Sequence, residues 1–343
     1  MQNKKTKIFL GAYLNYTNAQ NLNCLALAKN LNKEKFEVYA LTCHFGDKIE
    51  IDVNLFNCFK PFIISRIFGL IWGIFKCDVA YLPNHYIPNW VLRLAKVLGK
   101  KTFTTIEANM CDRSKRNILD YLGGEQSFKK HFNLIPNIFG ITKDIISKAN
   151  CGVQLEKKPL YLGVDCTNFT PKVKQKLNNI VYVGRLVKSK DVIEILSLAD
   201  IFSNINFHLV GQGNLRTELL KKATTNVKFY GLLNHNELND LFLEMDLHFL
   251  PSKSEGFPKV ILETAAAGIP SIVYADYGAK EWISHSNNGF VINEFEQIVE
   301  IVKELQKNKN LLKENSKAAI LLSEKFDWRI MIKDWENQIL NLK

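Results

Sequence analysis

The residues best suited to chemistry lie in one stretch of the chain, SKSEGFPKVILETAAAGIP (252–270). Apolar runs before it (247–250) and at its end (269–275) predict two buried strands. Pro258 suits the first residue of a helix between them, because its missing N–H costs nothing there. Gly268 suits the position just after the last turn of that helix. We therefore expect the order strand, loop, helix, strand.

The loop of this unit is the expected ligand site. In open α/β sheets, ligands bind at the carboxyl ends of the strands, and the free amides of a helix start favour an anion such as a phosphate. Glu255 lies in the loop, and Glu263 lies a little over one turn inside the helix, so both can face one crevice. An ionised carboxylate only accepts hydrogen bonds, and the vicinal hydroxyls of a sugar or a ribose supply them.

Four further motifs precede or lead into this stretch. They are Gly184-Arg185-Leu186 with Lys190, Gly211-Gln212-Gly213, Phe229-Tyr230-Gly231, and the run from Met245-Asp246 to Pro251-Ser252. Together with two glutamates separated by seven residues, these motifs resemble the signature of the family-four retaining glycosyltransferases of the GT-B fold. The resemblance is dense from about residue 179 to 293. It implies an α/β chain with two doubly wound, Rossmann-like domains that face each other across a cleft.

The resemblance also implies roles for the residues of these motifs. Glu263 would hold the ribose hydroxyls and Glu255 the hydroxyls of the donor sugar. Negative charge grows on the leaving diphosphate, and Arg185, Lys190 and the amides around Gly256 can meet it without a metal. The implied donor-binding residues are Gly184, Arg185, Lys190, Gly211, Glu255, Gly256, Phe257, Pro258 and Glu263.

No metal and no cofactor are expected. Metal-using transferases hold the metal with an Asp-x-Asp pair, and the sequence contains none. The donor itself would be a nucleotide-sugar, UDP- or GDP-linked. The resemblance further implies that the configuration at the anomeric carbon is retained, by front-face attack without a covalent intermediate.

The N-terminal half departs from the family pattern at two places. Where members carry a glycine-rich turn after the first strand, this chain has Asn18 between Thr17 and Ala19. Where many members place a histidine at a strand end, this chain has Glu107, which could contact the acceptor or the donor sugar. Asn18 and His85, which follows a predicted strand at 78–83, are candidates for the acceptor side of the cleft. The catalytic candidates are Glu255, Arg185, Lys190 and Glu107.

A length of 343 residues favours two domains, and alternating strands and helices predict parallel, doubly wound sheets. We expect an acceptor-binding domain at 1–170 and a nucleotide-sugar-binding domain at 171–325. A terminal helix at 326–343 should pack back on the first domain.

Positive charge is concentrated in the N-terminal half. The net charge is +11, and residues 1–171 hold 23 lysines and arginines against 13 aspartates and glutamates. This excess indicates either an effect on solubility alone or an anionic partner, such as a membrane surface or a diphosphate-linked lipid. Nucleic acid is the least favoured partner, because no recognition motif accompanies the charge. Residues 61–76 are apolar nearly all round but too short to span a bilayer. They predict either a helix buried against the sheet or one seated in the bilayer interface and anchored by Trp72.

Seven scattered cysteines without a CxxC pair predict no disulfide framework and no zinc site, which favours a reducing cytoplasm. The N-terminal apolar run lacks a small-residue cleavage site and is expected to be a first strand. The expected location is cytoplasmic, with peripheral contact to the inner face of the membrane.

The expected function is transfer of a sugar to a glycan or lipid-linked acceptor in surface polysaccharide or glycoconjugate assembly. A glycoside hydrolase using Glu255 and Glu263 is disfavoured, since hydrolysis of a neutral glycoside needs neither the basic pair nor a phosphate-ready helix. A non-hydrolysing sugar-nucleotide epimerase and a non-catalytic partner subunit of the same fold stay open as alternatives.

Overall fold

The structure is a computed structural model that describes residues 4–83, 87–111 and 122–342. The chain divides into two compact units, one formed by 1–162 with 328–343 and the other by 163–327, and we call them unit 1 and unit 2. The division at 162/163 falls a few residues before the expected boundary at 170/171. The C-terminal segment from Trp328 is grouped with unit 1.

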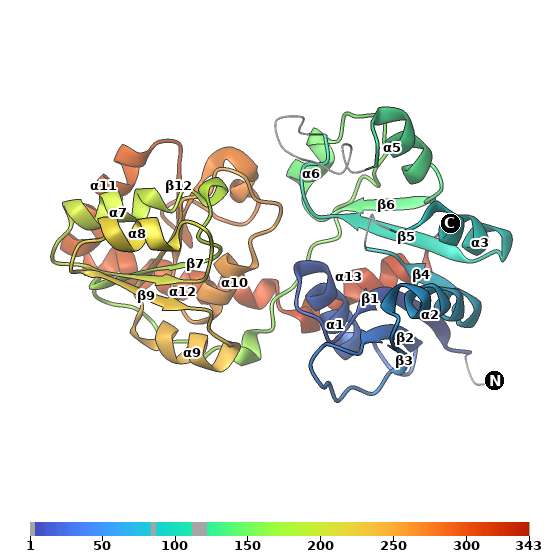
Figure 1. The fold of residues 1–343 in the computed structure, drawn as a ribbon. Coiled ribbons are helices and arrows are strands. Elements are labelled where there is room, and N and C mark those ends of the chain that lie inside the picture. Colours follow the sequence, from blue (N-terminus) through green and yellow to red (C-terminus); the bar gives the residue numbers. More distant parts are fainter. Residues whose placement is uncertain (1–3, 84–86, 112–121, 343) are drawn as a thin grey trace. The chain divides into compact units, whose positions relative to one another are not determined.

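Unit 1 is built on a six-stranded parallel sheet in the order β3-β2-β1-β4-β5-β6 (Figure 1). Its strands are β1 (Thr6–Tyr13), β2 (Phe36–Cys43), β3 (Asn54–Cys58), β4 (Val79–Tyr81), β5 (Lys101–Ile106) and β6 (Asn137–Gly140). Its helices are α1 (Ala19–Asn30), α2 (Phe62–Lys76), α3 (Asn89–Val97), α5 (Glu125–Phe132), α6 (Lys143–Lys148) and α13 (Trp328–Leu340). Helix α2 packs beside α3, and α1 packs beside α13. Since right-handed crossovers that run in opposite directions along a sheet cover opposite faces, the two pairs lie on opposite sides.

Unit 2 has a second six-stranded parallel sheet, in the order β12-β11-β10-β7-β8-β9. Its strands are β7 (Asn179–Val183), β8 (Asn206–Val210), β9 (Val227–Gly231), β10 (Leu247–Leu250), β11 (Ser271–Tyr274) and β12 (Gly289–Ile292). Its α-helices are α7 (Ile193–Ile201), α8 (Arg216–Lys222), α9 (His235–Glu244), α10 (Lys259–Ala266), α11 (Phe295–Lys307) and α12 (Lys309–Lys325). Its short 3-10 turns are η1 (Cys166–Asn168), η2 (Lys188–Lys190), η3 (Ala275–Tyr277) and η4 (Ala279–Glu281). Both sheets have the strand order of a Rossmann fold, so the predicted fold class is confirmed.

The strand order fixes where a ligand site can form. In each sheet the order reverses beside the first strand, between β1 and β4 in unit 1 and between β7 and β10 in unit 2. Loops leave in opposite directions at such a point and open a crevice at the carboxyl edge. In unit 2 the loops on either side of this point are 184–190 and 251–258, which carry the charged residues singled out in the sequence.

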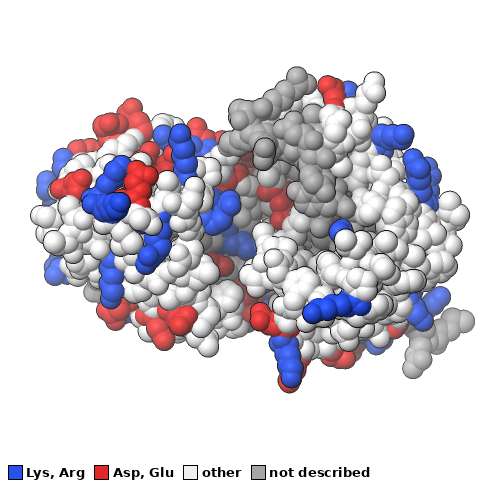
Figure 2. All heavy atoms as spheres, viewed as in Figure 1, with Lys and Arg blue, Asp and Glu red and all other residues white. Residues whose placement is uncertain are grey.

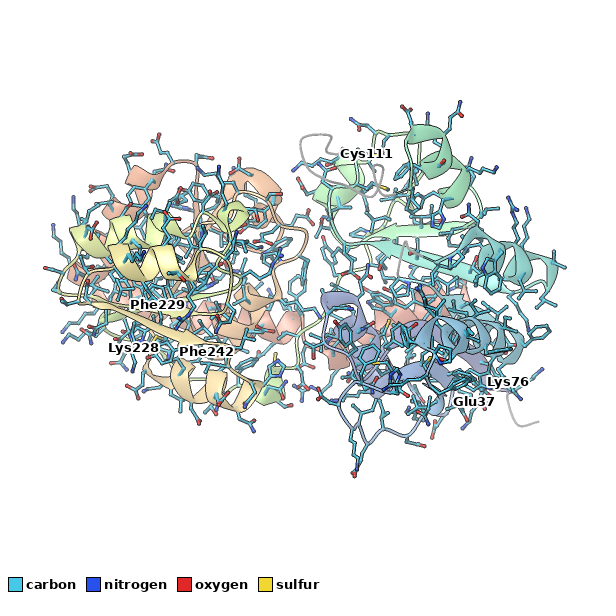
Figure 3. All side chains as sticks on the ribbon, viewed as in Figure 1. Glu37, Lys76, Cys111, Lys228, Phe229 and Phe242 are labelled. Carbon is cyan, nitrogen blue, oxygen red and sulfur yellow. A yellow bond between two sulfur atoms is a disulfide. The ribbon has the colours of Figure 1, made fainter. Side chains whose placement is uncertain are left out.

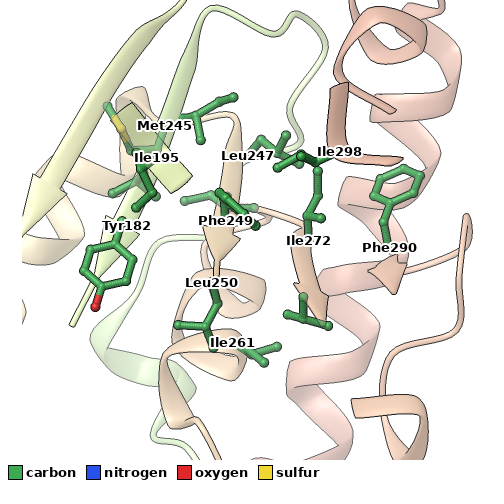
Figure 4. Packing of buried hydrophobic residues seen from close by; sticks show 14 of the residues in the cluster. Tyr182, Ile195, Met245, Leu247, Phe249, Leu250, Ile261, Ile272, Phe290 and Ile298 are labelled. Atoms are coloured by element: carbon green, nitrogen blue, oxygen red, sulfur yellow. The ribbon is translucent and has the colours of Figure 1, made fainter. Parts of the chain in front are cut away.

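The core of unit 2 holds these loops in place. Strand β10 is buried along its whole length, as expected for a parallel strand covered on both faces. Phe249 and Leu250 of β10 belong to one buried cluster with Ile261 of α10 and Ile272 of β11 (Figure 4). The strand before the 251–258 loop and the helix after it are therefore fixed by the same core.

Several elements differ from their predicted forms. Strand β3 and helix α3 were not predicted; β3 is a half-exposed edge strand without a clear apolar alternation. Lys190 ends the turn η2, three positions before helix α7 begins at Ile193. Residues 112–121 lie outside the described part of the chain, and α5 follows at Glu125.

Helix α2 is buried on one side only. Gly73 lies against the ring of Phe9, since a Cβ at Gly73 would come within 2.3 Å of that ring. Trp72 is half-buried and packs on Tyr39 and Phe56, with ring centroids 5.5 and 5.6 Å away. The opposite side is exposed, so the interpretation of 61–76 as a buried helix is wrong for its outer face. None of the helices in the described ranges has the length and apolar character needed to cross a membrane.

The cysteines differ from expectation at one pair. Cys111 and Cys151, both in unit 1, form a disulfide, so the expectation of a chain without disulfides is wrong there (Figure 3 labels Cys111). The two residues are 40 positions apart, and no local spacing marked them as partners. The other five cysteines are not disulfide-bonded.

Candidate active site

The loops that follow β7, β8 and β9 are joined to one another through their backbones. The Gly184 amide donates to the Val210 carbonyl at 3.0 Å, and the Gly211 amide donates to the Gly231 carbonyl at 2.6 Å. The Leu186 amide donates to the Gln212 carbonyl at 2.9 Å. The carboxyl edge of this half of the sheet is therefore a tightly bonded layer of loops.

The glycines of these motifs are required by this packing. Gly211 has a φ of +136°, and a Cβ there would lie 1.9 Å from the Gly184 carbonyl oxygen. A Cβ at Gly213 would lie 2.1 Å from the Leu186 carbonyl oxygen. Only glycine lets the two loops approach so closely. The motifs around Gly184 and Gly211 thus fix the backbone that carries Arg185.

Lys190 and Glu255 meet across the switch point of unit 2. Their side chains form an ion pair and are only 18% and 12% exposed. Lys190 comes from the loop after β7, and Glu255 comes from the loop after β10. Two residues 65 positions apart, both predicted to belong to one donor site, are therefore in direct contact.

Arg185 presents the second positive charge of the site. It is exposed, and its backbone carbonyl accepts a hydrogen bond from the hydroxyl of buried Tyr182 at 2.9 Å. Within the described ranges, its guanidinium forms no ion pair with any carboxylate. The site thus combines one cation neutralised by Glu255 with one that is open to an anionic ligand.

The 251–258 loop ends in a helix start without a side-chain cap. Pro258 occupies the N-cap position with a φ of −75°, and helix α10 begins at Lys259, one residue after the predicted start. Pro258 itself has no polar side-chain group with which to cap the first amides of α10. The ring of Phe257 packs on Trp282 and Phe326, with centroids 5.2 and 5.9 Å away. The backbone around Gly256 is therefore held next to amides that can bind an anion.

Glu263 lies half-buried on α10, with its backbone fixed by the helix. Burial raises the pKa of its carboxyl group, and the positive charges of His235 and Lys259 oppose that rise. A carboxylate in such a place gains from hydroxyl donors that replace lost water. This surrounding is compatible with the role in binding ribose that was expected for Glu263.

A second polar cluster beside the site was not predicted. Glu194 of α7 accepts a hydrogen bond from the Tyr274 hydroxyl at 2.7 Å and pairs with Lys253 at 3.5 Å. The Lys253 ammonium also lies 4.9 Å from the centre of the Tyr274 ring. Lys253 is two residues before Glu255, so this cluster ties the 251–258 loop to α7 and β11. Glu194 and Tyr274 are 80 residues apart, and nothing local in the sequence pairs them.

The candidates in unit 1 have structural partners. The Asn18 side chain caps α1 by accepting from the Asn21 amide at 2.8 Å. Glu107, half-buried after β5, accepts from the Asn23 amide group at 3.1 Å and from the Thr105 hydroxyl at 3.4 Å. His85 lies outside the described residues. Asn18 and Glu107 therefore both follow strands at the carboxyl edge, each within a defined hydrogen-bond network.

Comparison with known proteins places this geometry in a family. Residues 167–321 match the family described as glycosyl transferases group 1. This match spans nearly all of unit 2 and just under half of the chain. Together with relatives that are named glycosyltransferases, the match identifies the protein as an enzyme of the transferase class. It confirms the resemblance seen in the motifs around Lys190 and Glu255.

Relatives and solved structures agree with that assignment. An uncharacterized 41.2 kDa protein in the cps region of Klebsiella pneumoniae is 29% identical over 283 residues, covering 81% of this chain and 71% of that protein. The capsular polysaccharide biosynthesis glycosyltransferase CapH of Staphylococcus aureus is 29% identical over 119 residues, 31% of this chain and 33% of CapH. The crystal structure of Anabaena HepE in complex with UDP-glucose matches with a TM-score of 0.78 at 16% identity. That match covers 98% of this chain and 100% of HepE, and it shows a shared fold.

Proposed function

We propose that this enzyme is a metal-independent, retaining glycosyltransferase that moves a sugar from a nucleotide-sugar donor to a glycan or lipid-linked acceptor. The observation that carries the proposal is the contact of Lys190 with Glu255 at the switch point of unit 2. A cation for a diphosphate and a carboxylate for sugar hydroxyls are held together at the place where doubly wound sheets bind ligands.

The donor class is supported by the shared fold with HepE, which was crystallised with UDP-glucose. A UDP- or GDP-linked sugar fits the order of charges along the site. Arg185 and the amides at the start of α10 would bind the diphosphate, and Glu263 would bind the ribose. Glu255 would accept from hydroxyls of the donor sugar.

The acceptor class is supported by the relatives. One is encoded in a cps region, and another is CapH, a capsular polysaccharide biosynthesis glycosyltransferase. We therefore assign this enzyme to surface polysaccharide assembly, with a growing glycan or its lipid carrier as acceptor. We keep Glu107 as the candidate for contact with the acceptor or the donor sugar. Cytoplasmic location at a membrane is part of the same proposal.

The negative charge that develops during the reaction explains why Lys190 is paired with Glu255. The bond between the anomeric carbon and the diphosphate breaks while the acceptor oxygen bonds to the same face of that carbon. Negative charge then grows on the leaving oxygen, and a preorganised cation stabilises it in the transition state. Lys190 is held in advance by Glu255, so it needs little reorganisation when the diphosphate arrives. Arg185 and Lys190 together would supply the positive charge that a metal supplies elsewhere.

A donor panel tests the proposal. The purified protein is incubated with UDP-glucose, UDP-galactose, UDP-N-acetylglucosamine and GDP-mannose, and mass spectrometry follows release of nucleoside diphosphate and free sugar. Slow hydrolysis of one donor, unchanged by EDTA, is the expected result. NMR of the first-formed sugar should show the anomer of the donor. An epimerase would leave a changed sugar on the nucleotide, and activity lost in EDTA but restored by magnesium or manganese would overturn metal independence.

A further inference from the structure

The outer face of helix α2 in unit 1 is apolar and exposed. Ile63, Ile67, Ile71 and Phe75 follow one another at intervals of four residues, which aligns them along one side of the helix. Ile63 is 76% exposed and Phe75 is 57% exposed. The large apolar side chains exposed on α2 are Ile63, Ile64, Ile67, Phe68 and Phe75.

This face is not the side that α2 needs for the fold. The buried side consists of Ser65, Gly69, Leu70, Gly73 and Ile74, and the helix packs through it on β1, β2 and β3. A surface helix of a globular protein normally turns polar residues outward, so its apolar stripe is buried and its outer face is charged. Helix α2 instead has apolar residues on both sides. Contiguous exposed apolar surface of this kind marks an interaction site.

Helix α3 extends the same surface. It packs beside α2 on one face of the sheet, so the outer sides of both helices point away from that face together. Trp90 is 40% exposed and Val97 is 83% exposed on α3. We call the exposed residues of α2 and α3 the α2–α3 face.

The charged residues of the two helices that form this face have one sign. Helix α2 carries Arg66 and Lys76, α3 carries Arg93 and Lys96, and neither helix contains an aspartate or a glutamate. Lys60 stands exposed just before α2, and Lys76 lies at the end of that helix (Figure 3). In Figure 2 the surface over unit 1 is mainly white, with blue and a few red groups near its margins, whereas blue and red groups are mixed more densely over unit 2.

We propose that unit 1 binds an anionic lipid bilayer through the α2–α3 face. Helix α2 would lie in the plane of the interface, because it has 15 residues and spanning takes about 20. Its isoleucine and phenylalanine side chains would enter the boundary between headgroups and acyl chains. The lysines and arginines would contact the anionic headgroups of the lipids. Acidic residues on a partner protein would replace these headgroups poorly.

An aromatic cluster gives the docked unit an orientation. Phe62, at the start of α2, lies 5.2 Å from Phe45 and 5.4 Å from Tyr13, measured between ring centroids. Phe45 in turn lies 5.8 Å from Tyr16, and Phe45 and Tyr16 are both exposed. Tyr13 and Tyr16 lie at or just after the end of β1, and Phe45 lies just after β2. Apolar surface therefore continues from α2 to the carboxyl edge of the unit 1 sheet. The bilayer would therefore lie next to that edge.

Flotation with lipid vesicles tests the proposal without any need for donor or acceptor. The full chain is mixed with vesicles of phosphatidylcholine alone or with about 30% phosphatidylglycerol, at low salt and at about 0.5 M salt. Binding is expected only with phosphatidylglycerol and at low salt. Phe68→Asp should lower the partition coefficient at least tenfold, since it removes an aromatic ring that the bilayer would bury and adds a negative charge. Arg66→Ala should lower it roughly fivefold, the change that corresponds to one basic residue near such a surface.

Leu321→Asp on α12 is the matched control, because Leu321 is 57% exposed but belongs to unit 2. It should bind vesicles like the unaltered chain, and all variants should keep their far-UV circular dichroism. Equal loss in Leu321→Asp and Phe68→Asp would overturn the proposal, as would equal binding to uncharged vesicles. Light scattering without lipid tests whether a second copy of the chain occupies the face instead. If the chain forms dimers that Phe68→Asp abolishes, and if it does not bind vesicles, the face belongs to that second copy.

Discussion

The two units share one strand order but close the loop after the first strand by different means. In unit 2 the loop after β7 is joined to the end of β8 by the backbone of Gly184, and Gly211 allows the close approach. In unit 1 a side chain does this work. Asn15, buried after β1, donates to the Cys43 carbonyl at 2.8 Å and accepts from the Cys43 amide at 2.8 Å.

This difference shows how one topology supports two kinds of edge. Backbone closure leaves the side chains of the loop free of this task, so Arg185 can meet a ligand and Lys190 can pair with Glu255. Closure in unit 1 uses asparagine side chains of the loop and of helix α1. Asn21 of α1, for example, accepts from the Tyr13 amide and donates to the Tyr16 carbonyl. The edge of unit 2 is therefore suited to bind a charged ligand strongly, whereas the edge of unit 1 is largely satisfied within itself.

The largest expected effect tests the cations of unit 2. Arg185→Ala and Lys190→Ala should each lower turnover by roughly one to three orders of magnitude, since each removes a preorganised charge from the leaving diphosphate. Steady-state rates with the donor found in the panel measure this. Lys188→Ala is the matched control, because Lys188 is exposed in the same 3-10 turn and should keep its rate. Near-normal rates in both Arg185→Ala and Lys190→Ala would show that the donor does not bind at the carboxyl edge of the unit 2 sheet.

Substitution of Glu263 should affect mainly the binding of nucleoside diphosphate, whereas substitution of Glu255 should affect mainly turnover. Glu263→Ala should weaken nucleoside diphosphate binding by about 10- to 150-fold, the loss of a charge-assisted hydrogen-bond pair to ribose. Glu255→Ala should leave this affinity unchanged or raise it, because Lys190 is released from its ion pair. Turnover should still collapse in Glu255→Ala. Calorimetry with UDP and GDP distinguishes the two variants, and the reverse order would mean that the donor lies the other way round.

One substitution in each unit compares how much the two modes of loop closure contribute to the free energy of unfolding. Gly211→Ala should lower the free energy of unfolding of unit 2 by about 2–4 kcal/mol, because its Cβ meets a carbonyl at 1.9 Å. Asn15→Ala should cost unit 1 about 2–3 kcal/mol by leaving two buried backbone groups of Cys43 unpaired. Hydrogen exchange read by mass spectrometry assigns each loss to its unit.

Gly99→Ala is the control for backbone strain alone. Gly99 has a φ of +65°, but a Cβ added there would meet no neighbouring atom within 4 Å, so the substitution should cost only about 1 kcal/mol. If Gly211→Ala costs no more than Gly99→Ala, close approach is not what the glycine provides.

Acid should weaken unit 2 through its buried histidines. Burial lowers the pKa of His248 to about 3 and that of His208 to about 4, so both are neutral in the fold. The unfolded chain takes up these protons below about pH 6.5, and stability is therefore lost as pH falls from 6.5 towards 4. Each histidine should account for up to about 3 kcal/mol over that range. Thermal unfolding of His248→Leu/Ser271→Val should depend less on pH; an unchanged pH dependence would contradict the prediction.

The smallest effect concerns the cluster that holds the 251–258 loop. Glu194→Gln keeps an acceptor for Tyr274 but removes the charge that pairs with Lys253. Turnover should fall severalfold, since a partly exposed ion pair contributes less than about 1 kcal/mol. Affinity for the free diphosphate should not change, because the cluster orients the loop of Glu255 and leaves Arg185 untouched. A loss of diphosphate affinity would place Glu194 in the binding site itself.

Much of the fold and the position of the candidate site could be predicted from the sequence. Apolar runs such as 247–250 marked the strands of both sheets, and glycine, lysine and glutamate at family spacing marked the 184–190 and 251–258 loops. Edge strand β3 was missed because its residues are half-exposed and lack alternation.

Contacts between distant segments could not be predicted. The Glu194–Tyr274 hydrogen bond and the Cys111–Cys151 disulfide each join residues whose local sequences carry no mark of the other. Composition alone also could not distinguish a buried helix from an exposed one at 61–76. That depends on how much of its surface the sheet covers, and the sheet covers one side.

The return of helix α13 to unit 1 has a consequence for how the chain folds as it is made. Trp335 of α13 is fully buried, stacks edge-on with Tyr81 and donates to the Tyr161 carbonyl at 2.8 Å. Unit 1 therefore lacks part of its core until the last helix has left the ribosome, whereas unit 2 is one continuous segment, 163–327. The part of the protein that begins later in synthesis can be complete first. A nascent chain stalled before Trp328 should thus carry a folded unit 2 beside an unfinished unit 1 that still requires protection by chaperones.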